Sequence, residues 1–451
     1  MKSRSILSHR LTVFFLACLI AAFTQAAAHA SGFALIEQSV SGLGNAYSGG
    51  AAAAEDASTI FYNPAGLTRL QGTQILPGAH VIIPSAKFSN DGSTRFTGAP
   101  LSGGNGGDGG VTKVIPNFYA STQVGKVYFG LGVNAPFGLA TKYDSGWVGR
   151  YHAIESDVLT ININPSIAFK ATDNLSIGAG LSAQYLKAKL SNAIDVGGIS
   201  FARSRNPLAL SLSDGFVELN GDSWGFGFNL GALYEFSKDT RMGISYRSRI
   251  KHKLEGDADF SGTDALAAAA GFFDRSVYAN IMLPDSASVS FVHSFSPQWT
   301  VMADFTWTNW SLFKELRVQF DPVAGRTTAA DSVTTENWRD NYRYSIGVSY
   351  MPDPKWTFRS GVAYDTAAVR NAEYRTPRIP DADRIWLALG AGYKLSDNFA
   401  VDLGYAHIFV KDSRIGKTAT GPTDENFFRG NLHGSYDSHI NIISAQAKIT
   451  F

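Results

Sequence analysis

The chain has 451 residues and a nearly even charge balance, with 39 Lys and Arg against 38 Asp and Glu. This balance excludes a basic nucleic-acid-binding surface. The mean hydropathy of −0.05 and a single long apolar run exclude a polytopic helical membrane protein, which would carry several runs of ~20 apolar residues. Charged residues are scarce at 17%, whereas Gly (45) and aromatic residues (8 Trp, 18 Tyr and 30 Phe) are abundant. This composition favours an all-β fold whose strands have one apolar face and one polar or small face.

The N-terminal residues have the organisation of a secretory signal peptide. A basic start is followed by an apolar run over 11–23 and by a small-x-small cleavage pattern over 28–30. This run is too short for a retained membrane anchor, because its helix would not cross the ~30 Å of a hydrocarbon core. We therefore predict a signal peptide over 1–30. Cys18 is the only cysteine and lies within it, so the mature chain can form no disulfide.

Residues 31–72 differ from everything that follows. They are rich in Gly and Ala and lack sustained alternation, so they do not form a lipid-facing strand. A flexible periplasmic tail is one interpretation. However, the segment has many apolar side chains for a disordered region. These side chains are Phe33, Leu35, Ile36, Ile60, Phe61, Tyr62 and Leu67. We therefore expect a compact plug inside a wide barrel.

From residue 73 onward, side chains alternate with a period of two, which is typical of β-strands. In 224–236 (WGFGFNLGALYEF), large apolar residues occupy one face and mostly small or polar residues the other. A soluble β-sandwich also alternates, but this second face lacks the bulk to fill the space between two sheets. Many runs also exceed the ~5–6 residues of a globular strand. The pattern therefore indicates strands that cross a membrane.

The alternating segments predict a fourteen-stranded antiparallel transmembrane β-barrel over 73–451, since membrane strands must close to pair every edge. The predicted strands are 73–88, 113–125, 127–142, 154–170, 173–190, 216–237, 239–256, 277–295, 297–320, 335–351, 354–367, 384–396, 397–411 and 434–451. Short turns, expected in the periplasm, alternate with long loops, expected outside the cell. The last strand ends on Phe451, which resembles the signal that the barrel-assembly machinery recognises.

The segment SGFALIEQSVSGLGNAYSGGAAAAEDASTIFYNPAGL closely resembles the N-terminal hatch of the long-chain fatty acid transporter (FadL) family of outer-membrane proteins. Asn63, Pro64 and Ala65 match the hatch motif of that family. Two further segments, 219–236 and 378–407, follow the family in spacing and residue type. The resemblance covers essentially the whole mature chain.

This resemblance implies an outer-membrane barrel with a hatch over 31–72 and the uptake of hydrophobic molecules. Phe33 matches a family Phe that contacts ligand. The resemblance also implies release sideways into the membrane, through a gap where the third strand kinks; here that strand contains Pro136, Phe137 and Gly138. Pro cannot donate to the ladder and Gly tolerates unusual backbone angles, so the residues themselves also predict a local break.

In the family, two basic side chains in the lumen hold the ligand carboxylate. One aligns with Arg317 and the other with Asn192, which is not basic. Either Lys187 or Lys189 substitutes for it, or the ligand is not a carboxylate. In the strand around Arg317, alternation puts the guanidinium on the more polar face, which predicts that it points into the lumen. An ordinary lumen-facing charge is the alternative role.

The long loop 257–276 contains a short helix-prone apolar stretch with Leu266, Phe272 and Phe273. Exposed apolar patches usually mark binding. We expect this loop to pack against the apolar residues of 191–215 and to form a groove that captures the ligand. The alternative is that the two loops only shield each other from water.

Enzyme motifs are absent from the sequence: there is no HExxH and no G-x-S-x-G. The Gly-rich run 103–110 has no Lys-Ser/Thr after it, so it is expected to be a loop and not a phosphate site. No cofactor or metal is expected.

A general aqueous porin is an alternative function, but a porin would give no reason for a plug. The expected partners of this monomer are outer-membrane lipid and either a long-chain fatty acid or an aromatic or other neutral hydrocarbon.

Overall fold

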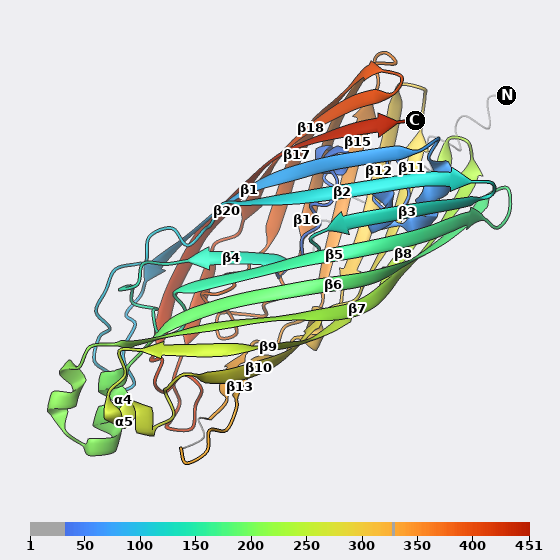
Figure 1. The fold of residues 1–451 in the computed structure, drawn as a ribbon. Coiled ribbons are helices and arrows are strands. Elements are labelled where there is room, and N and C mark those ends of the chain that lie inside the picture. Colours follow the sequence, from blue (N-terminus) through green and yellow to red (C-terminus); the bar gives the residue numbers. More distant parts are fainter. Residues whose placement is uncertain (1–31, 327–329) are drawn as a thin grey trace.

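The computed structural model describes residues 32–326 and 330–451. The predicted signal peptide over 1–30 lies outside the described residues. Within them, one antiparallel sheet of twenty strands closes on itself, because β1 (Gln74–Asn90) pairs with β20 (Leu432–Thr450). Figure 1 shows the long, tilted strands that form this wall.

The strands make up fourteen spans of the wall, as predicted, because six spans are divided into two strands each. The divided spans are β3 (Val127–Asn134) with β4 (Gly138–Lys142), β8 (Thr240–Arg247) with β9 (Ile250–Ser261), β10 (Arg275–Leu283) with β11 (Ser286–Ser294), β12 (Trp299–Thr308) with β13 (Glu315–Phe320), β14 (Ser332–Thr335) with β15 (Asn341–Tyr350), and β18 (Phe399–Val410) with β19 (Ser413–Lys417). The undivided spans are β1, β20, β2 (Lys113–Val124), β5 (Glu155–Lys170), β6 (Leu175–Ile194), β7 (Gly215–Ser237), β16 (Trp356–Asp365) and β17 (Arg384–Ser396).

The alternation predicted from the sequence sets the two faces of the wall. In β7, Trp224, Phe226 and Phe228 point outward, and Phe226 is 75% exposed. Buried polar side chains such as Asn164 and Asn229 point inward and bond to each other at 2.9 Å. The wall therefore has an apolar exterior and a polar interior over this part of its height, as a transmembrane barrel requires.

The long loops gather at one end of the barrel. They carry α4 (Val196–Ser204), η2 (Pro207–Ser211) and α5 (Ala265–Ala269), and the C-terminus lies at the opposite end (Figure 1). The short η3 (Trp310–Leu312) lies between β12 and β13. In the described part of the chain, no helix is long and apolar enough to cross a membrane.

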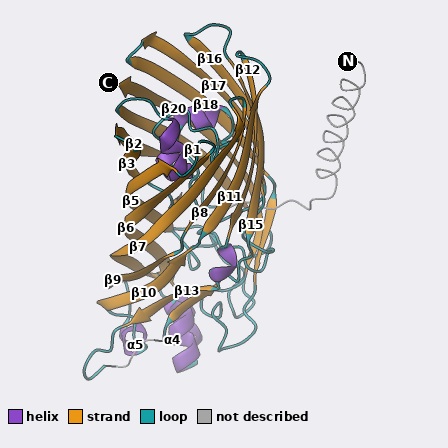
Figure 2. Cartoon of the chain, turned by 90° about the vertical axis from the view of Figure 1, so that its right-hand side faces the viewer, coloured by secondary structure: helices purple, strands orange, loops and turns teal. Residues whose placement is uncertain are grey.

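Residues 32–72 form α2 (Val40–Gly44), α3 (Thr59–Tyr62) and η1 (Pro64–Arg69), and Figure 2 shows short helices enclosed by the strands. Hydrogen bonds tie this N-terminal segment to strands on different sides of the wall. The Tyr119 hydroxyl of β2 donates to the carbonyl of Gln38 at 2.9 Å, and Arg343 of β15 donates to the carbonyl of Ala46 at 2.8 Å. The segment therefore packs against the inward face of the barrel.

Small residues on the strands make this close approach possible. A Cβ atom at Gly178 of β6 would lie 2.5 Å from the backbone nitrogen of Ala65. A Cβ atom at Gly231 of β7 would overlap the Asn63 side chain. Glycine at these strand positions therefore lets the N-terminal segment approach the wall closely.

Candidate ligand-binding site

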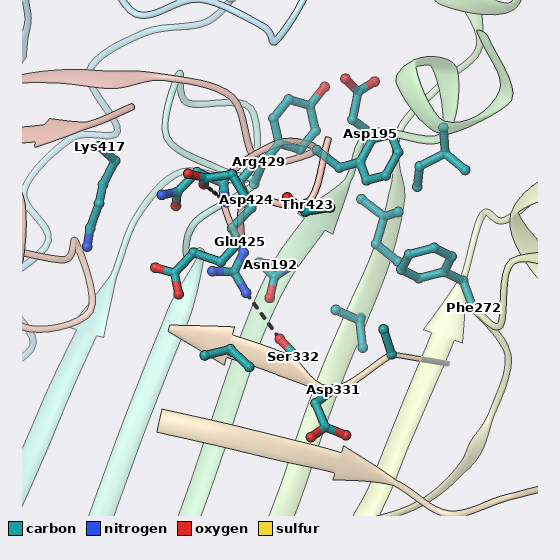
Figure 3. Close-up of a pocket in the computed structure, with 18 of the residues that line it drawn as sticks. Asn192, Asp195, Phe272, Asp331, Ser332, Lys417, Thr423, Asp424, Glu425 and Arg429 are labelled. Atoms are coloured by element: carbon teal, nitrogen blue, oxygen red, sulfur yellow. Dashed lines mark hydrogen bonds between the residues drawn. The ribbon is translucent and has the colours of Figure 1, made fainter. Parts of the chain in front are cut away.

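A cleft of about 1370 Å³ opens among the long loops. One side of it is apolar and includes Ile199, Val217, Phe260, Phe272 and Phe320. The other side is charged and includes Lys417, Asp424, Glu425 and Arg429, as Figure 3 shows. Such a surface, part apolar and part charged, suits a ligand that is itself amphiphilic.

The two apolar loops pack against each other as predicted. Ala267 of α5 is fully buried and belongs to the same apolar cluster as Ile199 of α4. The Ser200 hydroxyl donates to the Asp264 carboxylate at 2.8 Å, which fixes the two helices together. The cleft among the long loops, called the outer cleft below, is therefore bordered by two loops that pack together and not by two independent loops.

The three aromatic and aliphatic residues predicted for this groove lie in different places. Phe272 lines the cleft. Phe273 instead packs its ring against the Arg275 guanidinium, 3.8 Å from the ring centroid. Leu266 is 40% exposed on the outer surface of α5. Of the three, only Phe272 lines the cleft.

A narrower pocket of about 80 Å³ lies around Phe33, inside the barrel. The Phe33 ring lies 4.7 Å from the ring of Trp310 and 6.0 Å from the rings of Phe137 and Trp338, centroid to centroid. The other lining residues are mostly aliphatic and include Leu139, Val158, Leu219, Leu254, Ile281, Leu316 and Val318. This pocket therefore suits an apolar chain.

Two charged residues also line the pocket around Phe33, Arg378 and Glu336. The Arg378 guanidinium donates to the carbonyl of Glu155 at 3.1 Å, to the Ser156 hydroxyl at 3.0 Å and to the Asn192 side-chain oxygen at 3.1 Å. Burial, assisted by the positive charge of Arg429, lowers the pKa of Arg378 to about 9. Among the described lining residues of this pocket, Arg378 is the one basic group, and it is held by Asn192, which the sequence resemblance predicts to stand where the family has a basic residue.

The prediction that Arg317 points into the lumen is wrong. Leu316 and Val318 line the apolar pocket, and consecutive residues of a strand point to opposite faces, so Arg317 projects away from it. Its guanidinium is held by Glu315 at 2.6 Å and Asp331 at 2.9 Å. These two carboxylates already neutralise the charge.

Lys187 and Lys189 do not substitute inside the lumen either. Lys187 pairs in register with Leu159, which is 43% exposed on the outer face of the wall. Lys189 is two residues further along the same face and forms an ion pair with Glu218 at 3.0 Å. Both lysines therefore lie outside the barrel.

The wall is broken at the predicted position in the third span. β3 ends at Asn134 and β4 begins at Gly138. Asn134 pairs with Asn162 of β5, and Gly138 pairs with Leu159, so four steps along one strand oppose three along the other. The extra residue makes a bulge at Pro136. In the described part of the chain, β4 pairs with β5 but forms no ladder with β2 on its other side.

The N-terminal segment fills the place of the missing neighbour. The backbone nitrogen of Leu35 donates to the carbonyl of Pro136 at 2.8 Å, and that of Gly138 donates to the carbonyl of Phe33 at 3.0 Å. A Cβ atom at Gly138 would lie 2.8 Å from the Leu35 side chain, so Leu35 lies directly at the break.

A cavity of about 530 Å³ lies at this break. Its lining includes Asp381 and Trp386, which are buried inside the barrel. The same lining includes Val114 and Leu159, which are 61% and 43% exposed on the outer face. It shares Phe33 with the apolar pocket, so the two spaces are neighbours.

The Asn-Pro-Ala motif lies against β7. The Asn63 side-chain nitrogen donates to the carbonyls of Ala51 at 2.6 Å and Ala232 at 3.0 Å, and its oxygen accepts from the nitrogen of Ala65 at 3.0 Å. Pro64 occupies the first turn of η1, where a missing N–H costs nothing. The motif therefore joins two parts of the N-terminal segment to the wall.

Arg378 was missed in the sequence because its loop, 366–383, has no strand periodicity. The available signal was the density of charge in RTPRIPDADR, immediately before and at the start of β17. Within residues 32–326 and 330–451, no group of His, Cys, Asp and Glu side chains has an arrangement that would hold a metal ion.

A family model described as "Outer membrane protein transport protein (OMPP1/FadL/TodX)" matches residues 20–451. An outer-membrane protein of Neisseria meningitidis serogroup B is 34% identical, over 95% of this chain and 97% of its own length. The long-chain fatty acid transport protein of Escherichia coli O6:H1 is 32% identical, over 84% of this chain and 87% of its own.

Solved structures agree with the barrel. A FadL homologue of Pseudomonas aeruginosa has a TM-score of 0.84 at 25% identity, covering 93% of this chain and 100% of that chain. The toluene transporter TbuX of Ralstonia pickettii shares the fold, with a TM-score of 0.66 at 22% identity and coverage of 92% and 100%. The chain therefore belongs to the OMPP1/FadL/TodX family of outer-membrane transport proteins and crosses the outer membrane as a multi-pass β-barrel.

Proposed function

We propose that this protein takes up long-chain fatty acids or similar hydrophobic molecules passively and releases them sideways into the outer membrane at the β3–β4 break. The observation that carries this proposal is the cavity of about 530 Å³ whose lining joins residues inside the barrel to residues on its lipid-facing surface. A relative that is 32% identical is a long-chain fatty acid transport protein.

The sideways route has a physical reason. An apolar chain gains ~0.8 kcal/mol for each CH₂ group that stays out of water. A path that ends in the hydrocarbon core keeps the chain dry, whereas a path along the barrel axis would end in the aqueous periplasm. Release at the break therefore needs no input of energy beyond the concentration gradient.

In this proposal, the N-terminal segment acts as the hatch. Its bonds to strands on different sides of the wall support a plug that blocks the axial route. Phe33 and Leu35 lie where the ligand would turn from the apolar pocket toward the break. The outer cleft with Phe272 would be the first place of capture.

The register of the third span provides a sharp test. Deleting Pro136 removes the extra residue of the bulge, so β3 and β4 are expected to join into one strand that pairs with β2. Because the exit into lipid is then closed, uptake of tritiated oleate by cells should fall at least about tenfold, while binding to the purified protein stays unchanged. Pro136→Ala is the matched control, since it keeps the extra residue and should keep uptake. Normal uptake by the deletion variant, with the wall closed in its crystal structure, would refute sideways release.

Uptake of neutral hydrocarbons is the second candidate. It is favoured by the apolar lining around Phe33 and by the shared fold of the toluene transporter TbuX. The two candidates differ in whether the protein needs a charged group for its ligand. Comparing the binding of a fatty acid with that of its uncharged ester distinguishes them.

A further inference from the structure

The Arg378 guanidinium is buried beside the apolar pocket without a hydrogen-bonded carboxylate. The residue is only 8% exposed, and all three of its hydrogen-bond partners are uncharged oxygens. The one carboxyl group among the described residues that acts on its charge is that of Glu336, and Glu336 forms no hydrogen bond to Arg378. Burying a charge without a counter-ion costs several kcal/mol, so such a group is stabilised by any anion that reaches it.

The residues around Arg378 do not neutralise it. Burial raises the pKa of Glu336 to about 8, so this carboxyl is mostly uncharged at neutral pH. Its oxygen accepts instead from the Trp338 ring nitrogen at 2.8 Å. Arg429 is a further nearby cation and itself lowers the pKa of Arg378. The local field therefore favours a negative ligand group.

Arg378 also lies at the boundary between two spaces. It lines the apolar pocket around Phe33, whereas its partner Asn192 lines the outer cleft. Its bonds to Glu155 and Ser156 fix the guanidinium on β5. Of its five N–H groups, the one on Nε has no partner among the described residues, so donors remain available.

We propose that Arg378, positioned by Asn192, binds the carboxylate of a single-chain anionic amphiphile, with the chain extending into the apolar pocket toward Phe33. This inference rests on the proposed function and narrows its ligand class to carboxylates over neutral hydrocarbons. Arg378, in the loop before β17, thus supplies the positive charge that binds the ligand carboxylate. Asn192 is then a positioning residue, and Arg317 has no part in head-group binding.

The test measures equilibrium binding of oleate and of methyl oleate to the full-length protein in lipid nanodiscs. Arg378→Gln should weaken oleate binding by about 10- to 100-fold, the value of a charge-assisted hydrogen bond, and change methyl oleate binding less than about threefold. Arg317→Gln is the matched control and should change neither ligand. Equal losses for both ligands, or no loss for either, would overturn the proposal.

A second variant covers the case in which Arg378→Gln fails to fold. Asn192→Asp is nearly isosteric and places a carboxylate 3.1 Å from the guanidinium, where the protein's own anion competes with the ligand. It should weaken oleate and spare methyl oleate. An unchanged ratio of the two affinities would overturn the proposal. If the wild-type protein binds neither ligand, the proposed function itself fails, which is a different outcome.

Discussion

The wall is interrupted between β3 and β4 and also between β8 and β9, and the two interruptions share one geometry. In both, the divided span has one residue more than the strand it faces. Arg247 pairs with Asn229 of β7 and Glu255 pairs with Asp222, so eight steps oppose seven. At the β3–β4 break, four steps oppose three.

The two breaks differ in what fills them. At the β8–β9 break, Ser248 and Phe228 exchange two hydrogen bonds of 2.9 Å, and the buried Ile250 side chain packs against Gly225 and Gly227 of β7. Residues of the wall itself therefore fill the space at the β8–β9 break. At the β3–β4 break, the filling comes from Leu35 of the N-terminal segment.

A bulge alone therefore does not make an opening. A bulge makes an opening only where two conditions are met. The neighbouring strand must stop pairing, and the space must be filled by a segment that is not a strand of the wall. Such a filling can be displaced without breaking the barrel, because its bonds to the wall are separate from the hydrogen bonds between the strands.

The largest effect is expected from deleting Asn63, Pro64 and Ala65. The deletion removes the two bonds from Asn63 to Ala51 and Ala232, worth together about 1–3 kcal/mol, so the equilibrium constant for binding of the segment in the lumen should fall about 5- to 150-fold. Uptake of labelled oleate should fall accordingly, and conductance in planar bilayers should rise. The barrel should remain folded and heat-modifiable on gels. Wild-type uptake in the deletion strain would contradict this.

A matched pair of truncations compares the two fillings directly. Ile250→Ala leaves a cavity within the wall and should lower the free energy of unfolding by about 2–5 kcal/mol, with little change in uptake. Leu35→Ala should change that free energy by less than about 1 kcal/mol, since the ladder does not depend on it. Urea unfolding in lipid vesicles measures both. If Leu35→Ala destabilises the barrel as strongly as Ile250→Ala, the two breaks are equivalent.

Leu35→Ala should act instead on transport. Removing the side chain from the break lowers the barrier to passage, and a lowering of about 0.7 kcal/mol gives about threefold faster uptake. Initial rates of oleate uptake, normalised to the amount of folded barrel, provide the measurement. Slower uptake would mean that Leu35 guides the ligand and does not obstruct it.

The smallest effect is a pH dependence set by Glu336. Its pKa rises from 4.5 to about 8 on burial, so the folded protein holds this proton more tightly than the unfolded chain, and stability is lost as pH rises through that window. Lys417, Arg378 and Glu425 are the charged groups that act on the Glu336 carboxyl.

Ionised Glu336 would also compete with a ligand anion for Arg378. Oleate affinity should thus fall a few-fold between pH 7 and 8.5 in the wild type and less in Glu336→Gln; identical profiles would contradict this.

The sequence predicted the fourteen spans and the break at Pro136, because period-two alternation and proline chemistry are local properties. It misplaced Arg317 for a physical reason. The more polar face of a membrane strand is expected to face the lumen, but in β13 the apolar face with Leu316 and Val318 lines the inner pocket. Arg378 could not be found from periodicity, since its position at Asn192 depends on how a long loop folds back into the barrel.

The β1–β20 seam has a consequence for the order of assembly. These are the first and last strands of the wall, so the cylinder closes only when the final strand has joined. The N-terminal segment leads directly into β1, and the backbones of Thr73 and Phe451 exchange hydrogen bonds of 3.2 and 2.9 Å beside the seam. Closure of the seam therefore also fixes the point at which this segment enters the barrel.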